Sequence, residues 1–204
     1  MGYATSNEPP FERGGFQPLP TGVAVGNEPF AGILGQEFQF DDMLWDQAQA
    51  GPPPARSGGK VTVRLVRNET GAAVLPQKMC KLDPTNPGLV SALTTAVTDD
   101  AYPADEFLPS TGCPDDGMFY VVVEGLAKVI LAATVIANIS AGDYIGPSGV
   151  TAGAVDIQDY TAVPTTGGPS KTYLQTLKAA RLKATAAVSS GASSSASTTV
   201  LVKK

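Results

Sequence analysis

The sequence contains no histidine, and this absence argues against several kinds of active site at once. Histidine is the commonest general base, the usual partner of a serine or cysteine nucleophile, and a frequent ligand of zinc and non-haem iron. The only cysteines are Cys80 and Cys113, and their spacing is not that of a CxxC motif. We therefore expect two reduced, mostly buried thiols, no metal or organic cofactor, and no enzymatic activity.

Long apolar runs and basic clusters are also missing. The most apolar stretch, residues 129–142, is bounded by charged residues and is too short to cross a bilayer. The N-terminus has no basic region followed by an apolar segment, so no secretory signal is predicted. Residues 1–56 carry two basic and seven acidic side chains, which accounts for the whole net charge of −5. Because no basic surface is indicated, neither nucleic acid nor a membrane is an expected partner.

Glycine and proline are abundant, with 22 and 17 residues, whereas charged residues make up only 16%. This composition is typical of a turn-rich β protein. We predict a mainly β fold, with a small β-barrel or β-sandwich body at residues 57–204 and a long extended N-terminal arm at residues 1–56. The body is organised around Met118–Leu131, a run of aromatic and β-branched residues that predicts a long central strand buried on both faces at its three valines. Gly125, in its middle, permits a bulge or a close backbone approach.

Other strands are predicted from alternating apolar residues and from the turns between them. Residues 89–97 fit either a strand or a short helix, and residues 173–188 have the same ambiguity. A hairpin with the last strand favours a strand for residues 173–188. The further predicted strands are residues 60–66, 74–82, 155–159 and 198–202.

The arm contains two similar extended segments, Asn7–Phe11 and Asn27–Phe30, in which prolines precede an aromatic ring. Aromatic residues are unusual in an isolated disordered tail, so the arm is predicted to dock on something. Two interpretations stay open: the arm wraps the body of its own chain, or it lies on a neighbouring subunit or partner. Residues 38–48 are compatible with a short helix. The predicted anchors of the arm are Phe11, Phe16, Phe30, Phe38, Phe40 and Trp45.

Searches for catalytic motifs give little. There is no GxGxxG motif after a strand, no P-loop and no GxSxG elbow. Asp115, Asp116 and Glu124 are the candidates for a hydrolase that uses carboxylates alone, which requires a defined separation across a cleft. The aspartates are expected to form turns instead.

Several segments together resemble the capsid decoration, or cement, proteins of tailed bacteriophages. They read SGGKVTVRLVRNETGAAVLPQKM, AYPADEFLPSTGCPDDGMFYVVVEGLAKV and ISAGDYI, followed by the strand end at Gln158-Asp159. The arm segment GILGQEFQFDDM is similar to N-terminal extensions of some members. The resemblance implies a small β-barrel or sandwich without catalysis, assembled as trimers or other symmetric clusters, with arms that join neighbouring capsomers. The serine-rich segment 189–197 and the repeated arm motif depart from that pattern.

The expected function is therefore a structural virion protein, made in the host cytoplasm and located on the outer surface of a phage head. Its expected partners are the major capsid protein and other copies of itself. An arm that orders on a neighbour gains contact area, and binding several capsomers adds multivalency. Removal of residues 1–50 is expected to leave a folded body that no longer binds heads. The alternative is a carbohydrate- or receptor-binding β module of a virion fibre, which would need an exposed aromatic platform.

Overall fold

The computed structural model describes most of the body and two parts of the N-terminal arm. The described residues are 8–19, 24, 27, 30–43, 55–96, 99–132, 139–149, 151–157, 182–185, 187 and 197–203. Within these ranges the fold is mainly β, as predicted, with ten strands and one short 3-10 helix. The elements are η1 (Ala31–Ile33), β1 (Glu37–Met43), β2 (Ala55–Asn68), β3 (Met79–Leu82), β4 (Leu89–Leu93), β5 (Ala101–Pro103), β6 (Met118–Ile130), β7 (Tyr144–Pro147), β8 (Val155–Ile157), β9 (Leu182–Ala184) and β10 (Ser197–Val202).

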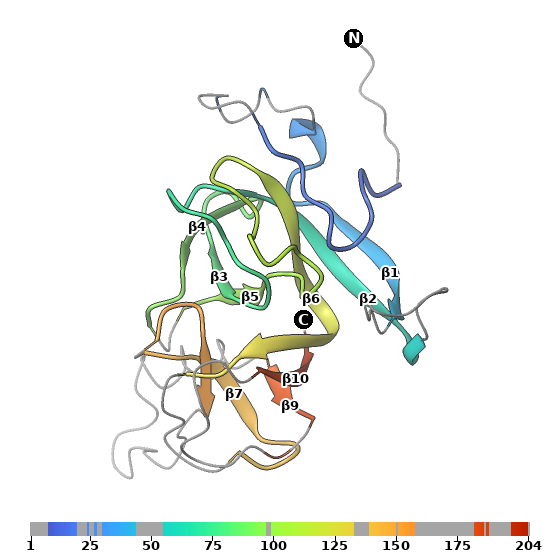
Figure 1. Cartoon of the computed structure of the whole chain (residues 1–204), viewed down its shortest axis with the longest axis vertical. Coiled ribbons are helices and arrows are strands. Elements are labelled where there is room, and N and C mark those ends of the chain that lie inside the picture. Colours follow the sequence, from blue (N-terminus) through green and yellow to red (C-terminus); the bar gives the residue numbers. More distant parts are fainter. Residues whose placement is uncertain are drawn as a thin grey trace.

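The described strands form one strongly curled sheet (Figure 1). Their order is β5-β3-β4-β2-β6-β10-β9-β7-β8, and β1 pairs with β2 beside this path. Every pairing is antiparallel except that of β2 with β4. The curl brings the end of β5 back to β6, where Ala104 forms a bridge with Val121 and the Asp105 N–H donates to the Tyr120 carbonyl at 3.0 Å. The sheet is therefore a half-barrel, within the predicted fold class.

The predicted central strand is β6, and it is shared by the two ends of the sheet. Its first half pairs with β2 and its second half with β10. A β-bulge separates the halves, because Val123 is an extra residue in the ladder with β2. Gly125 follows with a φ of +108°, and a Cβ there would lie only 3.0 Å from the Lys60 carbonyl oxygen. Of the two possibilities predicted for Gly125, the close backbone approach is present, and the bulge lies two residues earlier at Val123.

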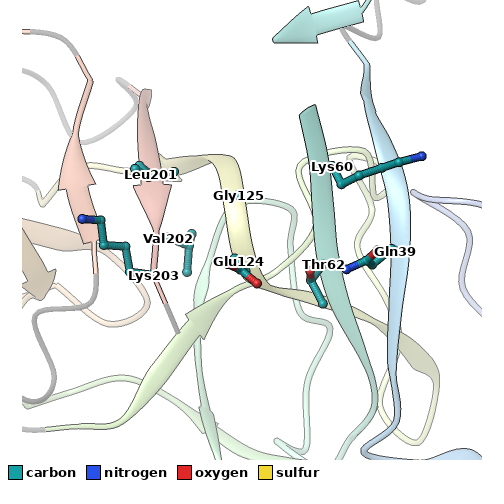
Figure 2. A pocket seen from close by; sticks show the side chains of 8 residues that line it. All are labelled: Gln39, Lys60, Thr62, Glu124, Gly125, Leu201, Val202 and Lys203. Carbon is teal, nitrogen blue, oxygen red and sulfur yellow. The ribbon is translucent and has the colours of Figure 1, made fainter. Parts of the chain in front are cut away.

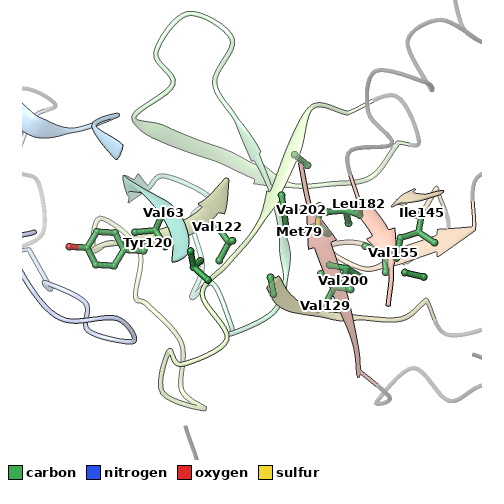
Figure 3. Packing of buried hydrophobic residues seen from close by; sticks show 14 of the residues in the cluster. Val63, Met79, Tyr120, Val122, Val129, Ile145, Val155, Leu182, Val200 and Val202 are labelled. Atoms are coloured by element: carbon green, nitrogen blue, oxygen red, sulfur yellow. The ribbon is translucent and has the colours of Figure 1, made fainter. Parts of the chain in front are cut away.

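Side chains of β6 alternate between two cores, because neighbours on a strand point to opposite faces. The first six residues of β6 are buried, which confirms the prediction of burial on both faces. Core A consists of Val66, Val74, Cys80, Val90, Tyr102, Ala104, Leu108, Cys113, Phe119, Val121 and Val123. Core B lies on the other face and continues along β6 to the C-terminal strands (Figure 3). Core B consists of Phe38, Val61, Val63, Leu65, Met79, Ala101, Met118, Tyr120, Val122, Ala127, Val129, Leu131, Ile139, Ile145, Val155, Leu182, Ala184, Val200 and Val202.

Most predicted strands are present, with different bounds. The predicted strand 74–82 is wrong in its first half, where Val74 makes only an isolated bridge with Cys113 and the strand begins at Met79. Pro76 lacks an N–H and Gln77 has a φ of +66°, so neither suits a continuous ladder. The ambiguous residues 89–97 form a strand as far as Leu93. The predicted C-terminal hairpin is confirmed by β9 and β10. Of the predicted strand 173–188, residues 173–181, 186 and 188 lie outside the described residues.

The short helix considered possible for residues 38–48 is not formed in residues 38–43. Residues 37–43 form β1, which pairs with β2 in the register Phe38 opposite Val63 and Phe40 opposite Val61. Pairing with a long neighbouring strand and burial of Phe38 outweigh the weak local preference for a helix. Residues 44–48 lie outside the described residues. The predicted boundary between arm and body at residue 56 falls inside β2, so the last described part of the arm belongs to the sheet.

Candidate functional site: the seam between arm and body

The arm residues Glu8–Leu19, here called the strap, cross the start of β6. The Gln17 N–H donates to the Met118 carbonyl at 2.9 Å, and the Met118 N–H donates to the Gln17 carbonyl at 2.9 Å. This reciprocal pair forms one antiparallel bridge and fixes the position of the strap along β6. The contacts of the strap with Asp105, Phe107, Met118 and Tyr120 are called the seam below.

A buried ion pair holds the middle of the strap. Arg13 Nη2 lies 2.8 Å from Asp105 Oδ1, and Arg13 Nε donates to Asp105 Oδ2 at 3.2 Å. The two side chains are only 8% and 1% exposed. Two parallel bonds between a guanidinium and a carboxylate are among the strongest side-chain hydrogen bonds, and removal of one buried partner typically costs about 3–5 kcal/mol. The guanidinium carbon also lies 4.5 Å from the centre of the Phe107 ring, at cation–π distance.

Gly14 lets the strap approach the body closely. Its φ is +79°, and a Cβ at this position would lie 2.5 Å from the Phe107 carbonyl oxygen and 2.7 Å from Phe107 Cβ. Any side chain here would both strain the backbone and collide with the body. The sequence Arg13-Gly14 therefore combines the charge that pairs with Asp105 and the residue that lets this charge reach it.

An aromatic cluster forms the apolar part of the seam. The Tyr120 ring lies 4.7 Å from that of Phe11, 6.1 Å from that of Phe38 and 5.6 Å from that of Phe40, measured between ring centres. The Tyr120 hydroxyl donates to the Phe11 carbonyl at 3.0 Å, so the buried polar tip has a partner. Burial raises the pKa of Tyr120 above its usual value, which keeps this hydroxyl a donor.

The rest of the described arm covers more of core B. Leu19, Phe30, Ile33 and Leu34 are partly buried against it. The carbonyl of Leu65 also accepts from the Gly35 N–H at 2.8 Å. The arm is therefore the cover of an apolar face that β2 and β6 would otherwise present to water.

The structure places five of the six predicted anchors against their own chain. Phe11, Phe38 and Phe40 surround Tyr120, while Phe30 packs against core B and Phe16 against core A. Phe38 is only 4% exposed. Trp45 lies outside the described residues. These contacts correspond to the interpretation in which the arm wraps the body of its own chain. Binding of a partner through these rings stays a prediction.

A second surface feature is a groove of about 540 Å³ at the bend of β6 (Figure 2). Gly125 lines it from β6, Lys60 and Thr62 line it from β2, and Leu201 and Lys203 line it from the C-terminal end. Lys60 already pairs with Asp41 at 2.5 Å, but both side chains are more than 60% exposed. Such exposed pairs contribute little stability or specificity. Glu124 is the one carboxylate among the residues that line the groove.

The three candidate carboxylates do not meet at one place. Asp115 accepts a hydrogen bond from the Gly71 N–H at 2.9 Å, and Asp116 binds Arg67 at 2.6 Å. Both aspartates lie in the turn before β6, whereas Glu124 lies six residues along that strand from Met118. Six residues of a strand span about 20 Å, which exceeds the separation of the two carboxylates in glycoside hydrolases. The turn role predicted for the aspartates agrees with these contacts.

The two cysteines are free and buried in core A, as predicted. Burial raises the pKa of the Cys113 thiol to about 12, and burial together with the nearby Cys113 raises the pKa of Cys80 still further. Thiols of this kind are unreactive at neutral pH because the thiolate is the nucleophile. They act as small apolar core residues.

No family model matches the sequence, and no curated protein matches it. Among the described residues, no helix is both long and apolar enough to span a membrane. The same residues contain no group of three or more histidine, cysteine, aspartate or glutamate side chains placed to hold a metal ion.

Sequence reasoning found the aromatic anchors but missed the polar half of the seam, which is Arg13, Gln17 and Asp105. A signal was present, because Arg13 is the only basic residue before Arg56 and two glycines follow it. A single cation in an acidic segment, next to residues that permit close approach, points to a specific carboxylate partner. The identity of that partner depends on the curl of the sheet, which places Asp105 beside β6.

Proposed function

We propose that this chain is a capsid cement protein, which binds the outer surface of a phage head and clamps neighbouring capsomers. Its partners would be the major capsid protein and other copies of itself, in a trimer or another symmetric cluster. The role is structural, without catalysis. The N-terminal arm contributes to the clamping, and the body supplies the rigid part.

The observation that carries the proposal links the resemblance to the seam. The two most specific segments of the resemblance are Asp105–Pro109 and the MFYVVVEG strand beginning at Met118. These segments lie side by side in the fold, and both belong to the seam through Asp105, Phe107 and Tyr120. The segments on which the resemblance rests thus coincide with the receptor for an extended arm. Arms of this kind are what the resemblance assigns to clamping.

The alternative, a carbohydrate- or receptor-binding module of a fibre, has less support. Such a module needs exposed rings, yet Tyr102, Phe119 and Tyr120 are buried. Among the described large apolar residues, only Leu75 and Tyr144 are exposed, and they lie on separate elements. No aromatic platform is formed by these residues.

The test is quantitative mass spectrometry of purified virus particles, with this chain counted against the major shell protein. A copy ratio of order one is expected for a cement protein. A few copies per particle would indicate a fibre or portal component, and absence from particles would contradict the proposal. Stripping and re-adding the purified chain to heads provides the control, because a surface protein should rebind to saturation.

A further inference from the structure

The strap and its receptor are chemically complete and separable halves of one binding site. The strap supplies the rings, the cation and the glycine of the segment Phe11–Gln17. The receptor supplies the carboxylate of Asp105, the ring of Phe107 and the edge of β6. Each seam contact joins a strap residue to a body residue far away in sequence, 92 positions for the ion pair and 109 for the tyrosine hydroxyl. Nothing in these contacts requires that the two halves belong to one molecule.

We propose that the seam is exchangeable, so that the strap of one copy occupies the receptor of a second copy. Exchange of an identical segment is a low-cost route to association, because the exchanged contacts are the same as the original ones. The second copy is the natural occupant, since it alone brings Phe11, Arg13, Gly14 and Gln17 in the required order. This proposal does not depend on head binding.

The chain between the strap and the sheet is long enough for exchange. Ten residues, 20–29, separate Leu19 from Phe30, where the arm again packs on core B. An extended chain of this length spans up to about 33–36 Å, which is the diameter of a small domain. The strap can therefore reach a neighbouring copy while β1 stays paired with β2.

The energetics of the seam favour exchange over simple release. A strap that leaves without replacement exposes Tyr120 and leaves the buried Asp105 without its cation. Exchange with an identical strap restores both contacts, whereas simple release restores neither. Arg13 Nη1 is buried without a hydrogen-bond partner among the described residues, and an exchanged strap would carry the same atom into the same surroundings.

Exchange is expected where copies are held close together. Because the strap and its own receptor belong to the same chain, the strap acts there at a higher effective concentration than the strap of another copy in dilute solution. Copies in dilute solution therefore keep their own straps, whereas an array of neighbouring copies offers competing ones. A test must remove this intramolecular advantage.

Reversal of the charges of the Arg13–Asp105 pair removes the advantage that a strap has in binding its own chain. In Arg13→Glu the strap repels its own receptor, and in Asp105→Arg the receptor repels its own strap. When the two variants exchange straps, the acidic strap of the first meets the basic receptor of the second, and the unchanged Arg13 of the second meets the unchanged Asp105 of the first. Both exchanged seams are therefore matched, whereas every intramolecular seam is mismatched. The double variant R13E/D105R restores the match within one chain and is the control. We would co-express the differently tagged full-length single variants and analyse them by native mass spectrometry.

The expected result is a 1:1 complex of the two variants that neither forms alone, while the double variant stays monomeric in dilute solution. If each single variant is insoluble alone, recovery of both as soluble protein on co-expression is the same positive result. The inference is overturned if the double variant folds but the co-expressed singles remain separate or insoluble. A second pair, Gly14→Ala with Asp105→Ala, covers the case in which the reversed charges do not fit. One exchanged seam is then intact, and absence of a complex from both pairs also overturns the proposal.

Discussion

Single residues of the seam have roles that depend on where the curl of the sheet places them. Tyr120 is the centre of the aromatic cluster, and its hydroxyl also donates a hydrogen bond to the Phe11 carbonyl of the strap. Gly125 lets β2 and β6 approach each other closely because it has no side chain. The contribution of each of these residues to stability can be measured by a substitution with a matched control.

Tyr120→Phe removes the hydrogen bond to the Phe11 carbonyl and keeps the ring. We expect the free energy of unfolding to fall by about 1 kcal/mol, because a partly buried carbonyl loses its donor. Urea denaturation measures this change. Tyr144→Phe is the control, since Tyr144 is 48% exposed and its substitution should have almost no effect. Equal effects of the two substitutions would mean that the hydroxyl of Tyr120 does not hold the strap.

Gly125→Ala introduces a Cβ at a φ of +108°, next to the Lys60 carbonyl oxygen and Val61. The combination of backbone strain and overpacking predicts a loss of about 3 kcal/mol in the free energy of unfolding. Gly71→Ala is the matched control, because Gly71 has a φ of +77° but nothing within 4 Å of the position that a Cβ would occupy. That control isolates strain and should cost about 1 kcal/mol. Thermal and urea unfolding of both variants would show whether close approach at Gly125 matters beyond its φ.

At the scale of elements, the arm is part of the folded body. β1 pairs with β2 over most of its length, and the strap covers the Tyr120 face. The structure therefore argues against the expectation that a chain without residues 1–50 stays folded.

Deletion of residues 1–50 should expose the surface of core B that faces Phe38 and leave Asp105 without Arg13. We predict loss of a cooperative unfolding transition or aggregation, because burial of a large ring and a buried ion pair are both removed. Deletion of residues 1–7, which precede the strap, should leave the transition unchanged. Circular dichroism melting and light scattering measure both variants. A cooperative transition in the longer deletion would show that the arm is dispensable for folding.

The elements that could be predicted from the sequence are those whose signal is local and strong. The long apolar run of β6, the alternation in β2 and the C-terminal hairpin all follow from periods of two and from turn residues. β1 was missed because its strand character comes from pairing with β2, a partner found only in the fold. The seam was half predicted: the aromatic residues of the arm indicated docking, whereas the Arg13–Asp105 pair joins positions 92 apart and has no local pattern.

The stability of the whole molecule should fall at alkaline pH, because some titratable groups are buried in their neutral, protonated form. Burial raises the pKa of Cys80, Cys113 and Tyr120, so the folded state keeps protons that the unfolded chain releases. The contribution of these groups is fully present below their unfolded pKa values, about 9 for a thiol and 10 for tyrosine, and is lost as the pH rises through the folded values.

We therefore predict that the contribution of these three groups to the free energy of unfolding changes little from about pH 7 to about pH 8.5. It falls from about pH 9 upward. Chemical denaturation at several pH values measures the curve. Cys113→Ala should make the fall between about pH 9 and about pH 12 shallower, because one of the three titrating groups is gone. A wild-type curve that stays flat to about pH 11 would contradict burial of these groups.

One covalent strand runs through both ends of the sheet, and this has a mechanical consequence. β6 joins the β2 side to the β10 side without interruption, so a force that pulls the two ends apart is borne by peptide bonds. The hydrogen bonds on either side of Gly125 then share the tension in shear along the strand instead of opening one at a time. We therefore expect the fold to resist stretching along β6, because the ladder hydrogen bonds lie across that direction.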